Sequence, residues 1–192
     1  MRLFVAVETS PDVQAAAART IDELKRRTEE SAPHARVTWV KPDHLHLTVR
    51  FIGHVDPGVS EKILTTLDHP IQVPGFELTI EGTGTFPPHR PPRVIWAGIA
   101  GSLDTLHEVE REVRSRLQRV VPPGDERDYH PHLTLGRVKS PAGLRPAVVL
   151  RGLEHAVFGV IRVRAVTLFE SRLSSTGATY IPLRRTPLAH TS

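Results

Sequence analysis

Two short segments of this chain are near copies of each other, and they constrain the fold more than any other feature. Residues 44–49 read His-Leu-His-Leu-Thr-Val, and residues 130–135 read His-Pro-His-Leu-Thr-Leu, 86 positions further along a chain of 192 residues. A lone His-x-Thr is expected about once by chance here, but two copies sharing the central Leu and a following aliphatic residue are far rarer. The repeat predicts two similar lobes related by a pseudo-two-fold axis.

Alternation along a strand divides each copy into a polar and an apolar face. Successive side chains of a β-strand point to opposite sides, so His46 and Thr48 project together, about 7 Å apart, while Leu47 points into a core. His132 and Thr134 are predicted to do the same. If the two polar faces meet across a cleft, they place two imidazoles and two hydroxyls around one small volume.

Periodicity and turn residues divide the whole chain into strands and helices. Strands are expected at residues 2–8, 35–41, 44–53, 74–82, 93–100, 130–139, 157–171 and 178–184. Helices are expected after Ser10-Pro11, from 56 to 68 and from 103 to 119. The remaining segments are predicted as loops at 82–92 and 121–129, a hairpin turn at 174–177 and a loose tail after 185. The fold class is α+β, with residues 1–192 forming a single domain.

Composition narrows the chemistry and the compartment. The chain has no cysteine, which excludes disulfides, cysteine-based metal centres and thiolate nucleophiles. No apolar run approaches the ~20 residues of a membrane span, and the acidic Glu8 follows too soon for a signal peptide, so a cytoplasmic protein with no membrane partner is expected. The net charge of +4 and the excess of arginine over lysine fit either a GC-rich genome or recognition of phosphate.

Two histidines with two threonines suit the cleavage of a phosphodiester. Imidazoles with an ordinary pKa of about 6.5 can divide the general acid and general base roles near neutral pH. Threonine hydroxyls can donate hydrogen bonds to the non-bridging phosphate oxygens. No metal or other cofactor is required. The rival interpretation is a metal site, because His44 and His130 complete two His-x-His patterns, but neither segment contains a carboxylate.

With these motifs the sequence resembles the 2H phosphoesterase superfamily. More narrowly it resembles the bacterial and archaeal RNA 2′,3′-cyclic phosphodiesterases, also called 2′-5′ RNA ligases. The resemblance covers nearly the whole chain, and besides the two motifs it rests on residues 2–7, 39–40, 93–98, 131–137 and 168–173, with Gly177 and Tyr180. Gly136 is a small departure, since residues such as Ala are usual there, and no consequence is expected.

The resemblance implies a fold, a reaction and roles for four residues. The fold would be two pseudo-symmetric lobes, each an antiparallel sheet flanked by helices, around a central cleft that holds both motifs. His46 would be the proton donor, His132 the proton acceptor, and Thr48 and Thr134 would bind phosphate. The substrate would be RNA with a 2′,3′-cyclic phosphate end, the product a 2′-phosphate, and a weak reverse reaction would join ends through 2′-5′ bonds. No cofactor is implied, and a monomer is expected.

Four further residues are candidate substrate contacts, each with a structural alternative. Arg137 matches a family position, but strict alternation puts it on the face opposite His132, so it reaches the site only if the strand ends or bulges there. Tyr129 either stacks on a base or packs at the strand end. His44 and His130 either contact substrate or have plain surface roles.

Two other classes of function stay open. A 2H enzyme acting on a small cyclic nucleotide or on ADP-ribose cyclic phosphate would keep the same site. A non-catalytic RNA-binding module would explain the basic charge but not the paired His-Thr faces.

Overall fold

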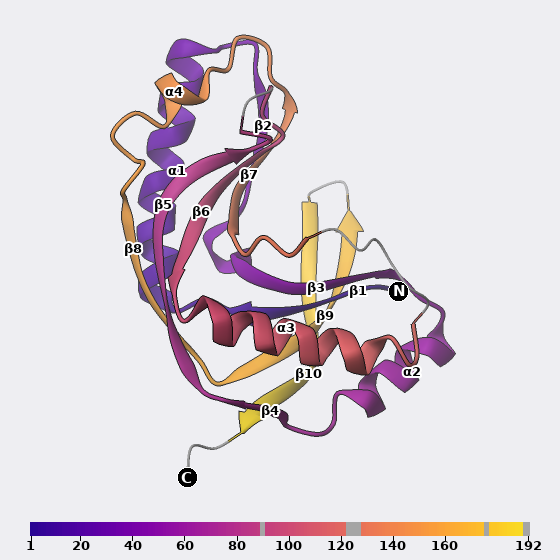
Figure 1. Ribbon diagram of the computed structural model, residues 1–192. Coiled ribbons are helices and arrows are strands. Elements are labelled where there is room, and N and C mark those ends of the chain that lie inside the picture. The colour runs from indigo at the N-terminus through magenta and orange to yellow at the C-terminus, as the bar shows by residue number, and fades with distance from the viewer. Residues whose placement is uncertain (89–90, 122–127, 175–176, 190–192) are drawn as a thin grey trace.

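The structure is a computed structural model that describes residues 1–88, 91–121, 128–174 and 177–189 (Figure 1). Its first half contains β1 (Arg2–Glu8), α1 (Pro11–Ser31), β2 (Arg36–Trp39), a 3₁₀ turn (Pro42–His44), β3 (His46–His54), α2 (Pro57–Thr66), β4 (Ile71–Pro74) and β5 (Phe76–Phe86). The second half contains β6 (Val94–Gly101), α3 (Leu103–Leu117), β7 (Leu133–Ser140), α4 (Pro146–Val149), β8 (Val157–Val163), β9 (Ala165–Ser174) and β10 (Gly177–Ala189). Among these described residues, no helix is long and apolar enough to cross a membrane.

The two motif strands are neighbours in the middle of one bent sheet. Within the described residues ten strands form the sheet, in the order β4-β10-β9-β1-β3-β7-β6-β5-β8, with β2 paired to β7. All these ladders are antiparallel except the parallel pair β4–β10. Strands β3 and β7 meet at the pair Leu47 and Leu133. The sheet therefore has two lobes joined at the motif strands: a first lobe of β1, β3, β4, β9 and β10, and a second lobe of β2, β5, β6, β7 and β8.

Two amphipathic helices pack on one face of this sheet and leave the motifs on the other. Helix α1 begins after Ser10, whose hydroxyl accepts a hydrogen bond from the Val13 amide, as expected of an N-cap residue. Each helix buries residues spaced three or four apart: Val13, Ala17, Ile21 and Leu24 in α1, and Leu106, Val109, Val113 and Leu117 in α3. These side chains share one core with Leu47 and Leu133. The motif histidines and threonines consequently lie on the opposite face, called here the motif face.

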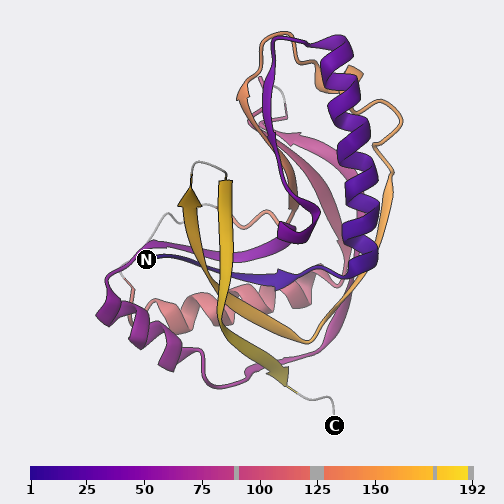
Figure 2. The same cartoon turned by 180° about the vertical axis from the view of Figure 1, so that it is seen from behind.

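The helices are exchanged between the lobes relative to the chain order. Helix α1 lies between β1 and β3 in the sequence, but it packs along β8 of the second lobe (Figure 2). Helix α3 comes from the second half of the chain and packs against β3 and β4 of the first lobe. The sequence repeat therefore predicts the two motif strands, whereas the lobes are not simply the two halves of the chain.

Several expected boundaries were wrong, and strand β4 was not predicted. The predicted strand 157–171 is two strands, since β8 pairs with β5 in the second lobe and β9 pairs with β1 in the first. The expected loose tail is strand β10, in which Leu188 lies beside Ile71 and is buried. Strand β5 extends to Phe86 into the expected loop at 82–92, and β7 begins at Leu133 rather than at residue 130. Residues 89–90, 122–127 and 175–176, which belong to the predicted loops and turn, lie outside the described residues.

Gly136 has a packing role that the sequence did not indicate. It pairs with Trp39 across the β2–β7 ladder. A Cβ atom at Gly136 would lie 2.8 Å from the Trp39 ring and 3.0 Å from Val37, closer than real contacts allow. Glycine in place of the usual alanine at position 136 was expected to have no consequence. That expectation is wrong in one respect, because the methyl group of an alanine would displace Trp39.

Candidate active site

The register between β3 and β7 places each motif histidine opposite the threonine of the other motif. Leu47 pairs with Leu133, so the same antiparallel register, continued by one residue on either side, sets His46 opposite Thr134 and Thr48 opposite His132. Ideal antiparallel geometry then separates the Cβ atoms of the two histidines, which are diagonal neighbours, by about 7–8 Å. That separation leaves room for one small group between two imidazoles and two hydroxyls.

Both imidazoles are held in the same tautomer by their own backbone. Nδ1 of His46 donates to the carbonyl of His44 at 2.8 Å, and Nδ1 of His132 donates to the carbonyl of His130 at 2.7 Å. Since a carbonyl oxygen can only accept, the ring proton of the neutral form is on Nδ1. Nε2 of each ring is then free of a proton and ready to act as a base.

Aromatic rings fix the orientation of the two imidazoles. The His46 ring lies 4.8 Å from Phe4 and meets Tyr180 edge-on at 5.0 Å. The His132 ring meets Phe86 edge-on at 5.1 Å. Phe4, Phe86 and Tyr180 belong to the family-like pattern of the sequence, but for none of them did that pattern predict a role beside the histidines. Phe4 comes from β1, next to β3, and Phe86 from the end of β5. These contacts restrict ring rotation, so each Nε2 keeps a defined direction.

Burial lowers the pKa of both histidines below the ordinary value of 6.5. Desolvation is the largest cause for His46 and for His132, and the positive charge of Arg137 lowers both pKa values further. The hydrogen bond from each ring to a backbone carbonyl acts in the opposite direction. Both rings therefore lose their charge at a lower pH than an ordinary exposed histidine does.

A bulge in β7 brings Arg137 onto the motif face. Thr134 pairs with Trp96 and Arg137 pairs with Val94, so Leu135 is an extra residue in the ladder. Trp96 and Val94 are two apart in β6 and share a face, and their partners must share it too. Strict alternation, which would place Arg137 on the opposite face, fails here. The influence of its charge on both imidazoles agrees with this position.

The first lobe has a phenylalanine where the second has that arginine. Thr48 pairs with Ala6 and Phe51 with Phe4, so a matching bulge at Val49 puts Phe51 on the motif face. Its side chain is 61% exposed. Phe51 was given no role from the sequence, although the 86-residue repeat aligns it with Arg137.

The other candidates surround the site in different ways. The Tyr129 hydroxyl donates to the Thr48 carbonyl at 3.1 Å, and its ring packs edge-on against His107, which favours the packing alternative over base stacking. The His44 ring lies 5.3 Å from Tyr180, and the His130 ring lies 6.3 Å from Phe86. Each of these two histidines supplies the backbone carbonyl that orients its motif neighbour.

Two cavities lie near these elements, and only one adjoins a motif histidine. A cavity of about 140 Å³ is bounded by His46, Phe4, Tyr180 and the carboxylates of Glu8 and Asp43. A larger one, of about 710 Å³, is lined by α3 and Tyr129 and touches neither His46 nor His132. The smaller cavity adjoins the candidate site on the His46 side only, since His132 and the motif threonines do not line it. In the described part of the chain, no three His, Asp or Glu side chains are grouped to hold a metal ion.

Comparison with known proteins places this geometry in a family. The model of the family "LigT like Phosphoesterase" matches residues 12–96 and 100–180, and each matched segment contains one motif. The chain belongs to this family. It is therefore a phosphoesterase.

Individual relatives match this chain over almost its full length. An RNA 2′,3′-cyclic phosphodiesterase of Methanothermobacter thermautotrophicus is 33% identical over 94% of this chain and 95% of its own. The crystal structure of TT0787 of Thermus thermophilus superposes with a TM-score of 0.79 at 25% identity, covering all of both chains. Apo LigT of Escherichia coli has a TM-score of 0.74 at 28% identity and 98% coverage of each chain. Like them, this phosphoesterase has an α+β fold with two lobes.

The alkaline limb of the kcat/KM profile is expected below pH 6.5. Acid–base catalysis by the pair needs one charged and one neutral imidazole, and kcat/KM reports the free protein, where both pKa values are lowered. Raising the pH past 6.5 therefore removes the acid. A bound phosphodiester anion favours the imidazolium, so the limb of kcat is expected at higher pH. Steady-state kinetics from about pH 5 to about pH 8 measures the alkaline limbs of kcat/KM and of kcat. A kcat/KM limb above about pH 7 would contradict the lowered pKa values of the two histidines.

Proposed function

We propose that this phosphoesterase hydrolyses RNA 2′,3′-cyclic phosphate ends to 2′-phosphomonoesters by two-histidine acid–base catalysis that requires no metal. The observation that carries the proposal is the β3–β7 register, which sets His46 opposite Thr134 and His132 opposite Thr48. The relative from Methanothermobacter thermautotrophicus, whose name specifies this RNA end, supports the choice of substrate. We place the reaction in the cytoplasm.

In the proposed reaction His132 is the base and His46 the acid. A water on the side of phosphorus opposite O3′ gives a proton to Nε2 of His132 while its oxygen bonds to phosphorus. The P–O3′ bond breaks in line, and O3′ takes the proton from Nε2 of the charged His46. His132 then releases a proton to water and His46 regains one, so the pair returns to its starting state.

The charge on the phosphate is held by donors from both motifs. The Thr48 and Thr134 hydroxyls donate to the non-bridging oxygens, whose negative charge grows as water adds. The guanidinium of Arg137, on the same face, can donate two parallel hydrogen bonds. With a 5′-hydroxyl in place of the attacking water, the same steps form a 2′-5′ diester and release O3′ as a hydroxyl, and excess water favours hydrolysis.

The product isomer tests the proposal directly. Hydrolysis of an oligonucleotide with a 2′,3′-cyclic phosphate is expected to give only the 2′-phosphate, because the two imidazoles, on opposite sides of phosphorus, serve one in-line path. Phosphorus NMR of the product distinguishes the 2′ and 3′ isomers. The reaction is run with and without excess EDTA and is expected to proceed equally. A 3′-phosphate product would mean that O2′ leaves instead of O3′, which contradicts the roles given to His46 and His132. A strict need for a divalent ion would overturn the two-histidine mechanism.

A further inference from the structure

Three cations lie beyond the second motif on the same face of the sheet. Arg137 is on the motif face, and in the β2–β7 ladder it pairs with Thr38. Arg36 is two residues from Thr38 in β2, and Lys139 is two residues from Arg137 in β7, so alternation along each strand puts both on that face. The register shifts here: Arg36 pairs with Ser140, and Lys139 is the extra residue of the ladder beside it. The residues between them, Val37 and Val138, pair with each other and pack against the core on the other side. Arg36, Arg137 and Lys139 are all exposed.

Nothing acidic on the neighbouring strands neutralises these cations. The sequences of β2, β6 and β7 contain no Asp or Glu. Within the described residues, none of the three cations has an ion pair. Some cations on the helices are paired instead: Arg26 on α1 pairs with Glu23 and Glu30, and Arg116 on α3 pairs with Glu112. The end of the β2–β7 ladder therefore presents uncompensated positive charge beside the catalytic pair.

The same face of the first lobe is aromatic instead of cationic. Phe4 lies 6.3 Å from Phe51, 5.4 Å from Phe169 and 5.2 Å from Tyr180. Phe4 and Phe169 are buried, so the ring that this group offers to a base is the exposed Phe51, with the half-buried Tyr180 beside it. An aromatic surface joined to a cationic one is the combination that holds single-stranded nucleic acid, since bases stack on rings and phosphates meet cations. Bases can stack on protein rings only when they are unpaired, whereas a duplex is recognised through its grooves. The aromatic rings therefore favour a single strand over a duplex.

We propose that Arg36 and Lys139 extend the site beyond Arg137 as a track for the backbone phosphates that precede the cyclic end of a single-stranded RNA. Successive motif-face residues of a strand are about 7 Å apart, so the track continues outward from the phosphate held by Arg137. The inference rests on the proposed function and makes it narrower: the substrate is an RNA chain rather than a mononucleotide. Recognition through phosphates is independent of base sequence.

The test compares two substrates that differ in their upstream nucleotides, and the salt dependence isolates the contribution of the upstream phosphates. One is a nucleoside 2′,3′-cyclic phosphate, and the other is a tetranucleotide ending in the same cyclic nucleoside. The measured quantity is the ratio of the kcat/KM value for the tetranucleotide to that for the mononucleotide. Each phosphate contact to a single strand releases about 0.7 counterions, so two contacts predict that this ratio falls about sevenfold when the salt concentration rises from about 50 to about 200 mM. In the double variant R36A/K139A the ratio is expected to be low and nearly independent of salt.

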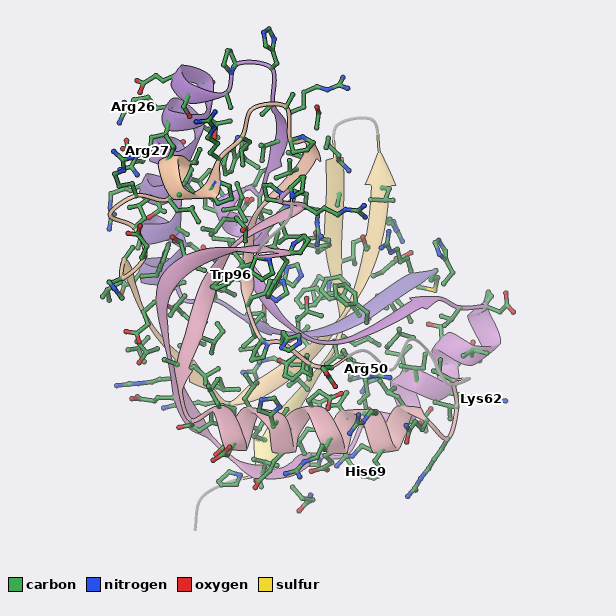
Figure 3. All side chains as sticks on the ribbon, turned by 45° about the horizontal axis from the view of Figure 1, so that its top comes forward. Arg26, Arg27, Arg50, Lys62, His69 and Trp96 are labelled. Carbon is green, nitrogen blue, oxygen red and sulfur yellow. The ribbon has the colours of Figure 1, made fainter. Side chains whose placement is uncertain are left out.

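A matched variant separates the track from net charge. Arg19 on α1 and Lys62 on α2 are exposed and lie outside the site (Figure 3 labels Lys62), so R19A/K62A removes one Arg and one Lys as well. It is expected to keep the full salt dependence of the ratio. A salt-independent ratio in the parent protein overturns the track, and so does a retained dependence in R36A/K139A or an equal loss in R19A/K62A.

Failure of the proposed function would look different. If the parent protein cleaves neither substrate, the assigned reaction is wrong. Fluorescence anisotropy of a tetranucleotide ending in a 2′-phosphate then tests the track alone, with weaker binding expected for R36A/K139A and unchanged binding for R19A/K62A. Equal binding by all three proteins would overturn the track.

Discussion

Replacing either motif histidine by alanine is expected to lower kcat by at least ~10²-fold, the usual contribution of one acid–base group. His46→Ala removes the proton for O3′, and His132→Ala removes the acceptor for the proton of the attacking water. Both rings lie on the motif face, and their neighbours Leu47 and Leu133 form the core, so the substitutions leave the core intact. Single-turnover cleavage of an oligonucleotide with a cyclic end measures the loss.

The double variant His46→Ala/His132→Ala is expected to lose far less than the product of the two single losses. The pair acts as a unit, because water attack without protonation of the leaving oxygen gains little. The free energy of unfolding of each variant serves as the control. Losses that multiply would show that the histidines act independently, and an unaffected single variant would remove that residue from the mechanism.

Arg137→Met is expected to lower kcat/KM by about 10²-fold or more, comparable to the removal of one preorganised donor to a developing oxyanion. Methionine keeps much of the length of the side chain but has no charge and no hydrogen-bond donor. Arg137→Lys is expected to recover only part of the loss, because an ammonium group cannot form the two parallel hydrogen bonds of a guanidinium.

The same substitution is expected to raise the pKa of both motif histidines. The Arg137 charge disfavours the imidazolium of His46 and of His132, so its removal makes both easier to protonate. The alkaline limb of kcat/KM then moves to higher pH, and NMR titration of the two rings measures the change directly. Thr134→Val is a useful control, because a hydroxyl does not titrate in this range. Unchanged histidine pKa values would place Arg137 away from the site.

Much of this site could be predicted from the pattern of residues that are close together in the sequence. The alternation in residues 44–49 and 130–135 was enough to separate the buried leucines from the projecting His and Thr, and the structure confirms this burial. The helix after Ser10-Pro11 followed from its cap and its spaced apolar residues. Such features depend on neighbours within a few positions, which the sequence displays.

Other residues depended on partners that are distant in the chain. Arg137 and Phe51 reach the motif face only because bulges at Leu135 and Val49 shift the register with β6 and β1. A bulge is a mismatch between two strands, so neither strand alone reveals it. The repeat did align Phe51 with Arg137, but without the bulges that alignment gave no reason to place either residue beside phosphate.

The first lobe shows the same division between local and tertiary causes. Arg50 lies in β3 just after the first motif but faces α3, where it pairs with the buried Glu110, 4% exposed (Figure 3). The Tyr129 hydroxyl donates to the Thr48 carbonyl, a contact between residues 81 positions apart. The sequence of β8 and β9 reads as one continuous strand, but the two strands belong to different lobes. The sequence by itself determined the two His-x-Thr motifs that carry the proposed acid and base and the strands on which they lie, since strand alternation depends on local periodicity. Only the tertiary structure decided which charges and rings surround that pair, because strand register and helix packing are set by contacts between segments far apart in the chain.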